Sequence, residues 1–127
     1  MAAKIKLGAR PETFKHIVKF PMLDGSEGAI EVEYIYRTRK EFGAFVDEVF
    51  AAAKEDRPEG EEFSWAALME KTSGANAEYV MKAVKGWNLD EPFTKLNVQQ
   101  LADELPAAVT AIMDAYREAI TQGRLGN

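Results

Sequence analysis

The spacing of apolar residues changes once along this chain, from every second residue to every third or fourth, and this change separates a strand-forming part from a helix-forming part. Residues 14–20 and 30–37 alternate between apolar and polar positions and are rich in β-branched and aromatic side chains, as half-buried strands are. Asp24, Gly25 and Gly28 lie between the two runs and supply the backbone freedom that a turn requires. The pattern predicts an antiparallel β-hairpin.

The two predicted strands have polar faces of opposite charge. Lys15 and Lys19 lie on the polar face of the first strand, and Glu31 and Glu33 lie on that of the second. Lysines and glutamates can therefore pair across the ladder. Residues 3–8 form a candidate third strand, whose lysines would discourage further pairing at the edge. The apolar faces hold Phe14, His16, Val18 and Phe20 in the first strand and Ile30, Val32, Tyr34 and Tyr36 in the second.

A helical period begins directly after the hairpin. Thr38 and Glu41 fit a capping box, in which each side chain binds the backbone N–H of the other residue at the start of a helix. Residues 55–62 hold five acids, a Pro and a Gly, so we expect an exposed loop there. The apolar stripe of the helix between them consists of Phe42, Phe45, Val46, Val49 and Phe50.

The rest of the chain is predicted to be helical almost to its end. Pro106 either opens the last helix at its first position or kinks the helix before it. The stripe of the last helix consists of Val109, Ile112, Met113, Tyr116 and Ile120, and Gly123 ends it. The other expected segments are a helix over 63–71, a break over 73–76, a helix over 77–85 that Gly86 stops, an irregular connector over 87–93, and a helix from an N-cap at Asn97 to about Glu104.

A hairpin followed by four or five helices indicates an α+β fold, with an N-terminal antiparallel β-hairpin, which a third strand can extend, and a mainly α-helical C-terminal part. We expect a single domain over residues 1–127. Its β-rich part covers 1–37, its helical part covers 38–122, and a flexible tail covers 123–127.

Charge and composition narrow the partners. The net charge is −5, yet the first 20 residues carry +4, which leaves −9 for the rest. Such an acidic chain repels phosphate, so nucleic acid is disfavoured as a partner. The apolar stretches are far shorter than the roughly 20 residues that span a bilayer, so no membrane association is expected. Without cysteine, the chain suits a reducing cytoplasm.

No pattern in the chain predicts catalysis, a metal or a cofactor. The single histidine, His16, lies on the apolar face of a predicted strand, where a packed imidazole is the expected role. No phosphate-binding loop, dinucleotide fingerprint or nucleophile elbow is present. Adjacent carboxylates such as Asp47 and Glu48 point about 100° apart on a helix and do not converge on one atom. We therefore expect a protein that is not an enzyme.

The aromatic residues are the candidate binding residues. Trp87 follows a predicted helix end, and its indole either pins the connector to the core or anchors a partner. The stripe of the first helix is wide and aromatic, which fits either a core or self-association. The candidate partner-binding residues are Trp87, Leu89, Phe93, Phe42, Phe45 and Phe50.

The C-terminal half resembles the tail assembly chaperones of long-tailed bacteriophages and prophages. Those proteins show a Gly-Trp connector, then a short helix ending in Pro, and a closing helix with a Tyr. The β-rich start followed by helices is also similar, so the resemblance covers most of the chain. The matching positions here are Gly86, Trp87, Leu89, Phe93, Pro106 and Tyr116.

The resemblance implies a non-enzymatic role in virion morphogenesis in the host bacterial cytoplasm. Members of that family bind the aggregation-prone tape-measure protein, keep it soluble, help to recruit major tail (tube) protein, and are absent from the mature virion. Self-association along one long client is expected from repeated weak contacts. Many members are also made in a longer form by programmed frameshifting. Gly126 and Asn127 can be encoded across the slippery sequence GGGAAAC, so we expect such a site at these codons.

Three other functions stay open at this point. The chain could be a structural minor tail or connector component that is retained in the particle. It could be a small protein–protein adaptor unrelated to phages. It could also be an enzyme that uses carboxylates alone, although no converging pair is evident in the sequence.

Overall fold

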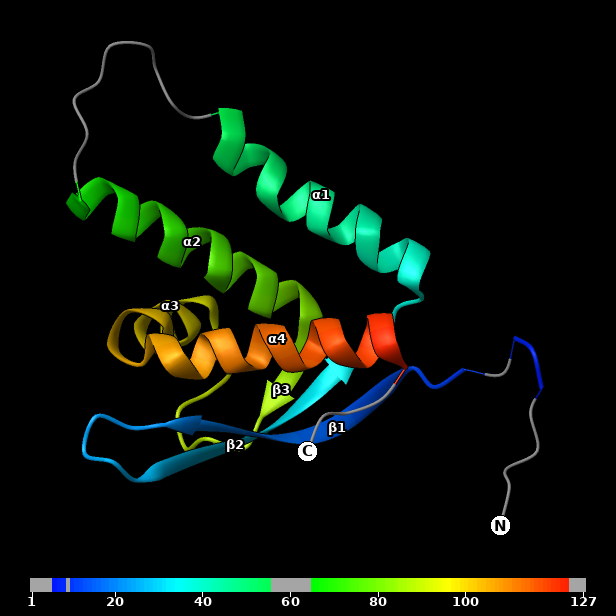
Figure 1. Ribbon diagram of the computed structural model, residues 1–127, viewed down its shortest axis with the longest axis horizontal. Coiled ribbons are helices and arrows are strands. Elements are labelled where there is room, and N and C mark those ends of the chain that lie inside the picture. Colours follow the sequence, from blue (N-terminus) through cyan, green and yellow to red (C-terminus); the bar gives the residue numbers. More distant parts are fainter. Residues whose placement is uncertain (1–5, 9, 56–64, 124–127) are drawn as a thin grey trace.

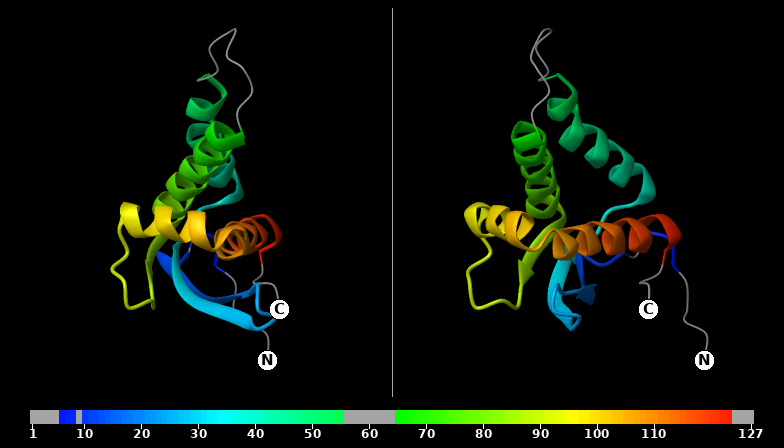
Figure 2. Two further views of the ribbon diagram at one scale, coloured as in Figure 1. Left: turned by 90° about the vertical axis from the view of Figure 1, so that its left-hand side faces the viewer. Right: turned by 60° about the vertical axis from the view of Figure 1, so that its left-hand side comes forward.

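The computed structural model describes residues 6–8, 10–55 and 65–123, which form a three-stranded antiparallel sheet covered on one face by helices (Figure 1). The element order is β1 (Thr13–Pro21), β2 (Glu27–Ile35), α1 (Arg39–Glu55), α2 (Trp65–Ala83), β3 (Val84–Trp87), α3 (Lys95–Glu104) and α4 (Pro106–Gln122). This arrangement confirms the α+β class. Helix α4 lies across the sheet, and α1 and α2 extend away from it on the same side (Figures 1 and 2).

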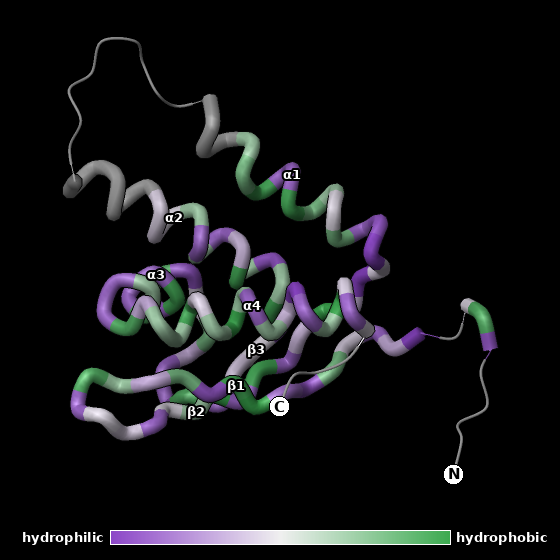
Figure 3. Tube along the Cα trace, viewed as in Figure 1, coloured by the Kyte–Doolittle hydropathy of each residue, from purple (hydrophilic) through white to green (hydrophobic). Residues whose placement is uncertain are grey.

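The hairpin forms with the faces that its alternating pattern predicts. Phe14 lies opposite Tyr34, and Val18 lies opposite Ile30, on the face that packs against the helices. Lys15 lies opposite Glu33 on the other face, as the predicted pairing of lysines with glutamates requires, whereas Lys19 lies opposite Ala29 and forms its ion pair with Glu27. The apolar even-numbered positions therefore face the helices, and most polar positions face outward. Figure 3 shows hydrophobic and hydrophilic residues alternating along the strands.

The turn between β1 and β2 depends on local polar contacts and one glycine. Gly25 has φ 87°, a left-handed conformation that other residues rarely adopt. Its N–H donates to the Met22 carbonyl over 3.1 Å. The Asp24 carboxylate accepts hydrogen bonds from the Ser26 hydroxyl and from the Ser26 N–H. Both bonds lower the pKa of Asp24, and the bond from the hydroxyl is the larger cause.

Helix α1 begins with the predicted capping box. The Thr38 N–H donates to Glu41 Oε1 over 2.9 Å, and the Glu41 N–H donates to Thr38 Oγ1 over 3.1 Å. The backbone bond from Thr38 is the largest cause of the lowered pKa of Glu41, and the bond from Arg10 comes next. The local sequence thus fixes where α1 starts.

The third strand comes from a different part of the chain than expected. Residues 84–87 pair antiparallel with β2, whereas Lys6, Leu7 and Gly8 are not in a strand. Residues 3–5 lie outside the described residues. Gly86 does not have the positive φ of a helix-stopping cap and lies instead opposite Glu33 within β3. The predictions of a helix over 77–85 and of an irregular chain over 87–93 were therefore wrong for Val84, Lys85 and Trp87. Pairing with β2 satisfies backbone groups that a local pattern does not reveal.

The expected break over 73–76 was also wrong. Helix α2 runs without interruption through Ser73, Gly74 and Asn76. Beyond them, Ala77 and Val80 are fully buried in the core, so packing holds the helix together despite weak helix formers. The predicted acidic loop lies almost entirely outside the described residues, as do residues 124–127 of the predicted tail.

The two C-terminal helices meet at Pro106, which opens α4 at its first position rather than kinking α3. Thr94, and not Asn97, caps α3, because Thr94 Oγ1 accepts the N–H of Asn97 over 3.2 Å. Helix α4 ends at Gly123, whose φ of 70° is the left-handed conformation of a helix C-terminus.

Candidate protein-binding site

The candidate residues of α1 lie in an aromatic core. Phe42 and Phe45 are only 8% and 4% exposed, and their rings contact the ring of Tyr116 at centroid distances of 5.7 and 6.1 Å. Phe50 is half-buried, with its ring 6.3 Å from that of Tyr79. The first two rings therefore hold α1 onto α2 and α4 and offer little surface to a partner.

Arg37 and the hydroxyl of Tyr116 make polar contacts beside these rings. The guanidinium carbon of Arg37 lies 4.3 Å from the centre of the Phe45 ring, a cation–π contact. Arg37 also donates to the Tyr116 hydroxyl over 3.0 Å, and that hydroxyl donates to the Ile35 carbonyl over 2.8 Å. The core thus joins the end of β2 to the middle of α4.

Two further tyrosines bond backbone carbonyls of α4. The Tyr34 hydroxyl donates to the Ile112 carbonyl over 2.7 Å, and the Tyr79 hydroxyl donates to the Met113 carbonyl over 3.4 Å. Burial raises the pKa of Tyr34, Tyr79 and Tyr116, because a phenolate would lose its hydration here. These hydroxyls therefore stay neutral and support the packing, which fits a structural role.

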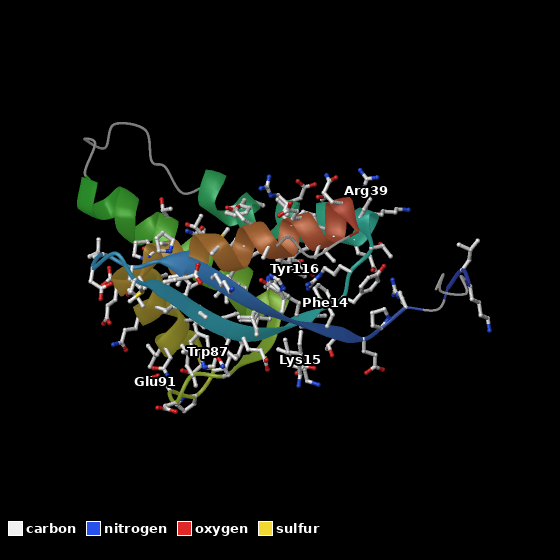
Figure 4. All side chains as sticks on the ribbon, turned by 60° about the horizontal axis from the view of Figure 1, so that its bottom comes forward. Phe14, Lys15, Arg39, Trp87, Glu91 and Tyr116 are labelled. Carbon is white, nitrogen blue, oxygen red and sulfur yellow. The ribbon has the colours of Figure 1, made fainter. Side chains whose placement is uncertain are left out.

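Trp87 forms a separate aromatic contact at the connector between β3 and α3. Its indole N–H donates to the carbonyl of Glu91 over 2.7 Å, and its ring meets Phe93 edge to face at 5.1 Å and 84°. Trp87 and Glu91 lie together at the connector in Figure 4, whereas Phe14 points toward Tyr116 beneath α4. The indole thus has a satisfied polar group and a half-buried ring.

Asparagine side chains hold the connector in place. Asn88 exchanges two hydrogen bonds with Glu31 of β2: its N–H donates to the Glu31 carbonyl, and its Oδ1 accepts the Glu31 N–H. Asn97 Nδ2 donates to the Pro92 carbonyl over 2.8 Å. Asn88 extends the ladder past the end of β3, so the backbone around Trp87 is fixed before any partner binds.

The apolar surface of the connector continues into α3. Leu89 and Phe93 are half-buried against the core, and Leu96 in the first turn of α3 is 78% exposed. Asp90 and Glu91 are exposed on the same connector. We call Trp87, Leu89, Phe93 and Leu96 the connector surface. Leu96 was not among the residues predicted from the sequence, although it is a large apolar residue three positions after Phe93.

The structure does not bring all candidate residues together. Trp87, Leu89 and Phe93 share one connector, whereas the phenylalanines of α1 lie on a helix that packs against α2 and α4. His16 is half-buried on β1 opposite Val32. In the part of the chain that the structure describes, no cluster of three or more His, Cys, Asp or Glu could hold a metal ion. None of the helices described there is long and apolar enough to span a bilayer.

Comparison with known proteins gives one match. A family model described as phage tail assembly chaperone matches residues 1–127, the full length of the sequence. Searches of curated proteins and of solved structures gave no match.

Proposed function

The chain belongs to the phage tail assembly chaperone family, and from this we propose that it binds the tape-measure protein, keeps it soluble and helps to recruit tail-tube subunits while the tail is built. The observation that carries the proposal is the match of the family model over residues 1–127. The family indicates a non-enzymatic role with protein partners of tail assembly in the host cell. The tape-measure protein and the tail-tube subunits as partners, and the absence of the protein from the finished virion, are our proposal.

We propose the connector surface as the contact for the client. A long helical client presents an apolar stripe, and the half-buried rings of Trp87 and Phe93 beside exposed Leu96 offer apolar area to receive it. Because hydrogen bonds already fix the connector, binding would cost little ordering entropy. Exposed Asp90 and Glu91 and the net charge of −5 would keep a chaperone–client complex dispersed.

Co-expression with the tape-measure protein tests the proposed function. We expect the client to become soluble and to co-purify with the chaperone. A client that stays insoluble and captures none of this protein would contradict the proposal. Mass spectrometry of purified virions tests the remaining part, since a structural minor tail component would be found in the particle and a chaperone would not.

Leu96→Ser tests the connector surface in the same experiment. Leu96 is 78% exposed, so its removal should leave the fold intact while lowering client co-purification by about tenfold, the effect of a modest interface hot spot. Leu23→Ser is the matched control, because Leu23 is a fully exposed leucine at the hairpin turn and is not part of the connector surface. Equal losses for both variants, or none for either, would place the client contact elsewhere.

The frameshifted longer form stays a prediction, and Gly126 and Asn127 lie outside the described residues. Sequencing the 3′ end of the gene tests it. The prediction loses its support if the codons for Gly126 and Asn127 contain no slippery run.

A further inference from the structure

The outer edge of β1 has no strand beside it among the residues that the structure describes. The sheet order is β1-β2-β3, so β1 pairs with β2 on one side only. Strand β1 is nine residues long, and a free edge of that length presents a row of backbone N–H and C=O groups that can pair with another chain.

The hydrogen-bond pattern tells which backbone groups face this edge. Met22 donates its N–H to the Ser26 carbonyl, and Tyr36 donates its N–H to the Glu12 carbonyl. Both pairs fit the register of the hairpin, and hydrogen-bonded pairs alternate with non-bonded pairs along an antiparallel ladder. The even-numbered residues of β1 therefore point their amide groups at β2, and Lys15, Ile17 and Lys19 point theirs at the free edge.

The same three residues carry exposed side chains. Ile17 is 52% exposed, and the Lys19 side chain is 64% exposed. Lys15 is exposed and points away from α4 (Figure 4). The edge thus combines free backbone groups with one apolar side chain between two cations.

Strand β2 only partly neutralises these cations. Lys19 lies 3.9 Å from Glu27 in a pair whose side chains are both more than 60% exposed, which contributes little. Glu33 opposite Lys15 accepts a hydrogen bond from the Thr13 hydroxyl over 2.7 Å. Lys15 forms no ion pair within the described part of the chain.

We propose that the free edge of β1 binds an extended acidic segment of a partner protein, which adds to the sheet as a fourth strand. Main-chain hydrogen bonds to Lys15, Ile17 and Lys19 would give affinity, as in β-strand addition generally. The partner strand would carry an apolar residue opposite Ile17, with an acidic residue two positions before it and another two positions after it. These acidic side chains would lie opposite Lys15 and Lys19. This surface is on the opposite edge of the sheet from β3, so the proposal is independent of the client contact at the connector.

A second copy of this chain fits the edge less well. In an antiparallel β1–β1 pair centred on Ile17, Lys15 of each copy would lie opposite Lys19 of the other. Like charges directly opposite each other destabilise a ladder. The charge of the edge therefore favours an acidic partner over self-pairing.

Amide hydrogen exchange of the full chain, followed by NMR, tests the proposal with a defined probe. The probe is the peptide acetyl-Thr-Glu-Thr-Val-Thr-Glu-Thr-amide, and the control is the same peptide with Lys in place of Glu. We expect the acidic peptide to slow exchange of the amides of Lys15, Ile17 and Lys19 by about tenfold and the control to have no effect. The amides of His16 and Val18 should be protected with or without peptide. The slowing should weaken as salt is added.

Three variants make the test specific. Lys15→Glu combined with Lys19→Glu should abolish the effect of the acidic peptide, while Lys40→Glu on the exposed side of α1 should leave it unchanged. Ile17→Pro removes one outward N–H and should also abolish binding, with persistent protection of His16 and Val18 showing that the hairpin is intact. The proposal is overturned if the acidic peptide protects none of the three outer amides, if both peptides protect them equally, or if the free protein already pairs as a dimer through β1.

Discussion

The two edges of the β1–β2 hairpin differ in how their backbone groups are satisfied. The edge of β2 pairs with the four residues of β3, and the side chain of Asn88 continues this ladder at Glu31. The edge of β1 runs for nine residues without a described neighbour, and lysines flank an exposed isoleucine there. The edge of β2 is therefore closed by β3 and Asn88, whereas the edge of β1 is protected only by charge. A partner can contact only side chains at a closed edge, but it can also pair with the backbone at an open edge.

The largest expected effect comes from proline substitutions at neighbouring positions of β1. Val18→Pro should lower the free energy of unfolding by about 3 kcal/mol or more, because it removes a ladder hydrogen bond and truncates a buried side chain. Ile17→Pro should cost no more than about 1 kcal/mol, because its N–H faces the free edge. Urea unfolding of both variants measures the difference. Equal losses would mean that the edge of β1 is not free.

A second pair of variants compares a glycine of β2 with a glycine of β3. Gly28→Ala should destabilise the protein by about 1–3 kcal/mol, because the added Cβ would lie 2.6 Å from ring carbons of buried Phe20. Gly86→Ala should be neutral or stabilise by about 0.5 kcal/mol, since nothing lies within 4 Å of its added Cβ and its φ is not positive. Thermal unfolding of both variants checks the contrast. A loss at Gly86 as large as at Gly28 would contradict the open space around Gly86.

Asn88→Ala should open the closed edge locally. The variant leaves the Glu31 N–H without its acceptor, which should cost about 1 kcal/mol and speed exchange of that amide. Asn97→Ala is the control, because it removes only the hydrogen bond to the Pro92 carbonyl. If exchange at Glu31 is the same in both variants, the side chain of Asn88 does not extend the ladder in solution.

The smallest expected effect concerns the ion pair between the segment before β1 and the start of α1. Arg10 lies 2.9 Å from Glu41, and the pKa of Glu41 is lowered by its bonds to Thr38 and Arg10. A lowered pKa in the folded state means that the contribution of Glu41 to stability is present above its ordinary pKa and is lost as the pH falls through the folded value. The stability difference between the wild type and Glu41→Gln should therefore shrink in acid, which chemical unfolding at several pH values measures. A difference that grows in acid would contradict the lowered pKa.

The connector surface shows how far the sequence could lead to the site. Trp87, Leu89 and Phe93 could be selected because large apolar residues follow a glycine in a segment without regular period. The sequence left open whether Phe42 and Phe45 lie in a core or face a partner, because a helical stripe has the same spacing in both cases, and their contacts with Tyr116 show that they lie in the core. Leu96 was missed because its exposure depends on how α3 sits on the rest of the fold.

Features that depend on neighbours along the chain follow from the sequence alone. The alternation of apolar and polar residues set the faces of β1 and β2, Thr38 and Glu41 set the start of α1, and Gly123 set the end of α4. In each case the groups that settle the conformation lie within a few residues or on facing strands of one hairpin, so their energies can be read locally.

Only the tertiary structure decided the features that depend on distant partners. Val84–Trp87 became a strand because the outer edge of β2, some fifty residues earlier, leaves backbone groups to be paired. Helix α2 continued through Gly74 because its buried residues pack against α1, α3 and α4. A local pattern does not indicate which distant segment will satisfy a hydrogen bond or cover an apolar face. Here the long-range contacts outweighed the local signals for a break at 73–76 and for a helix stop at Gly86.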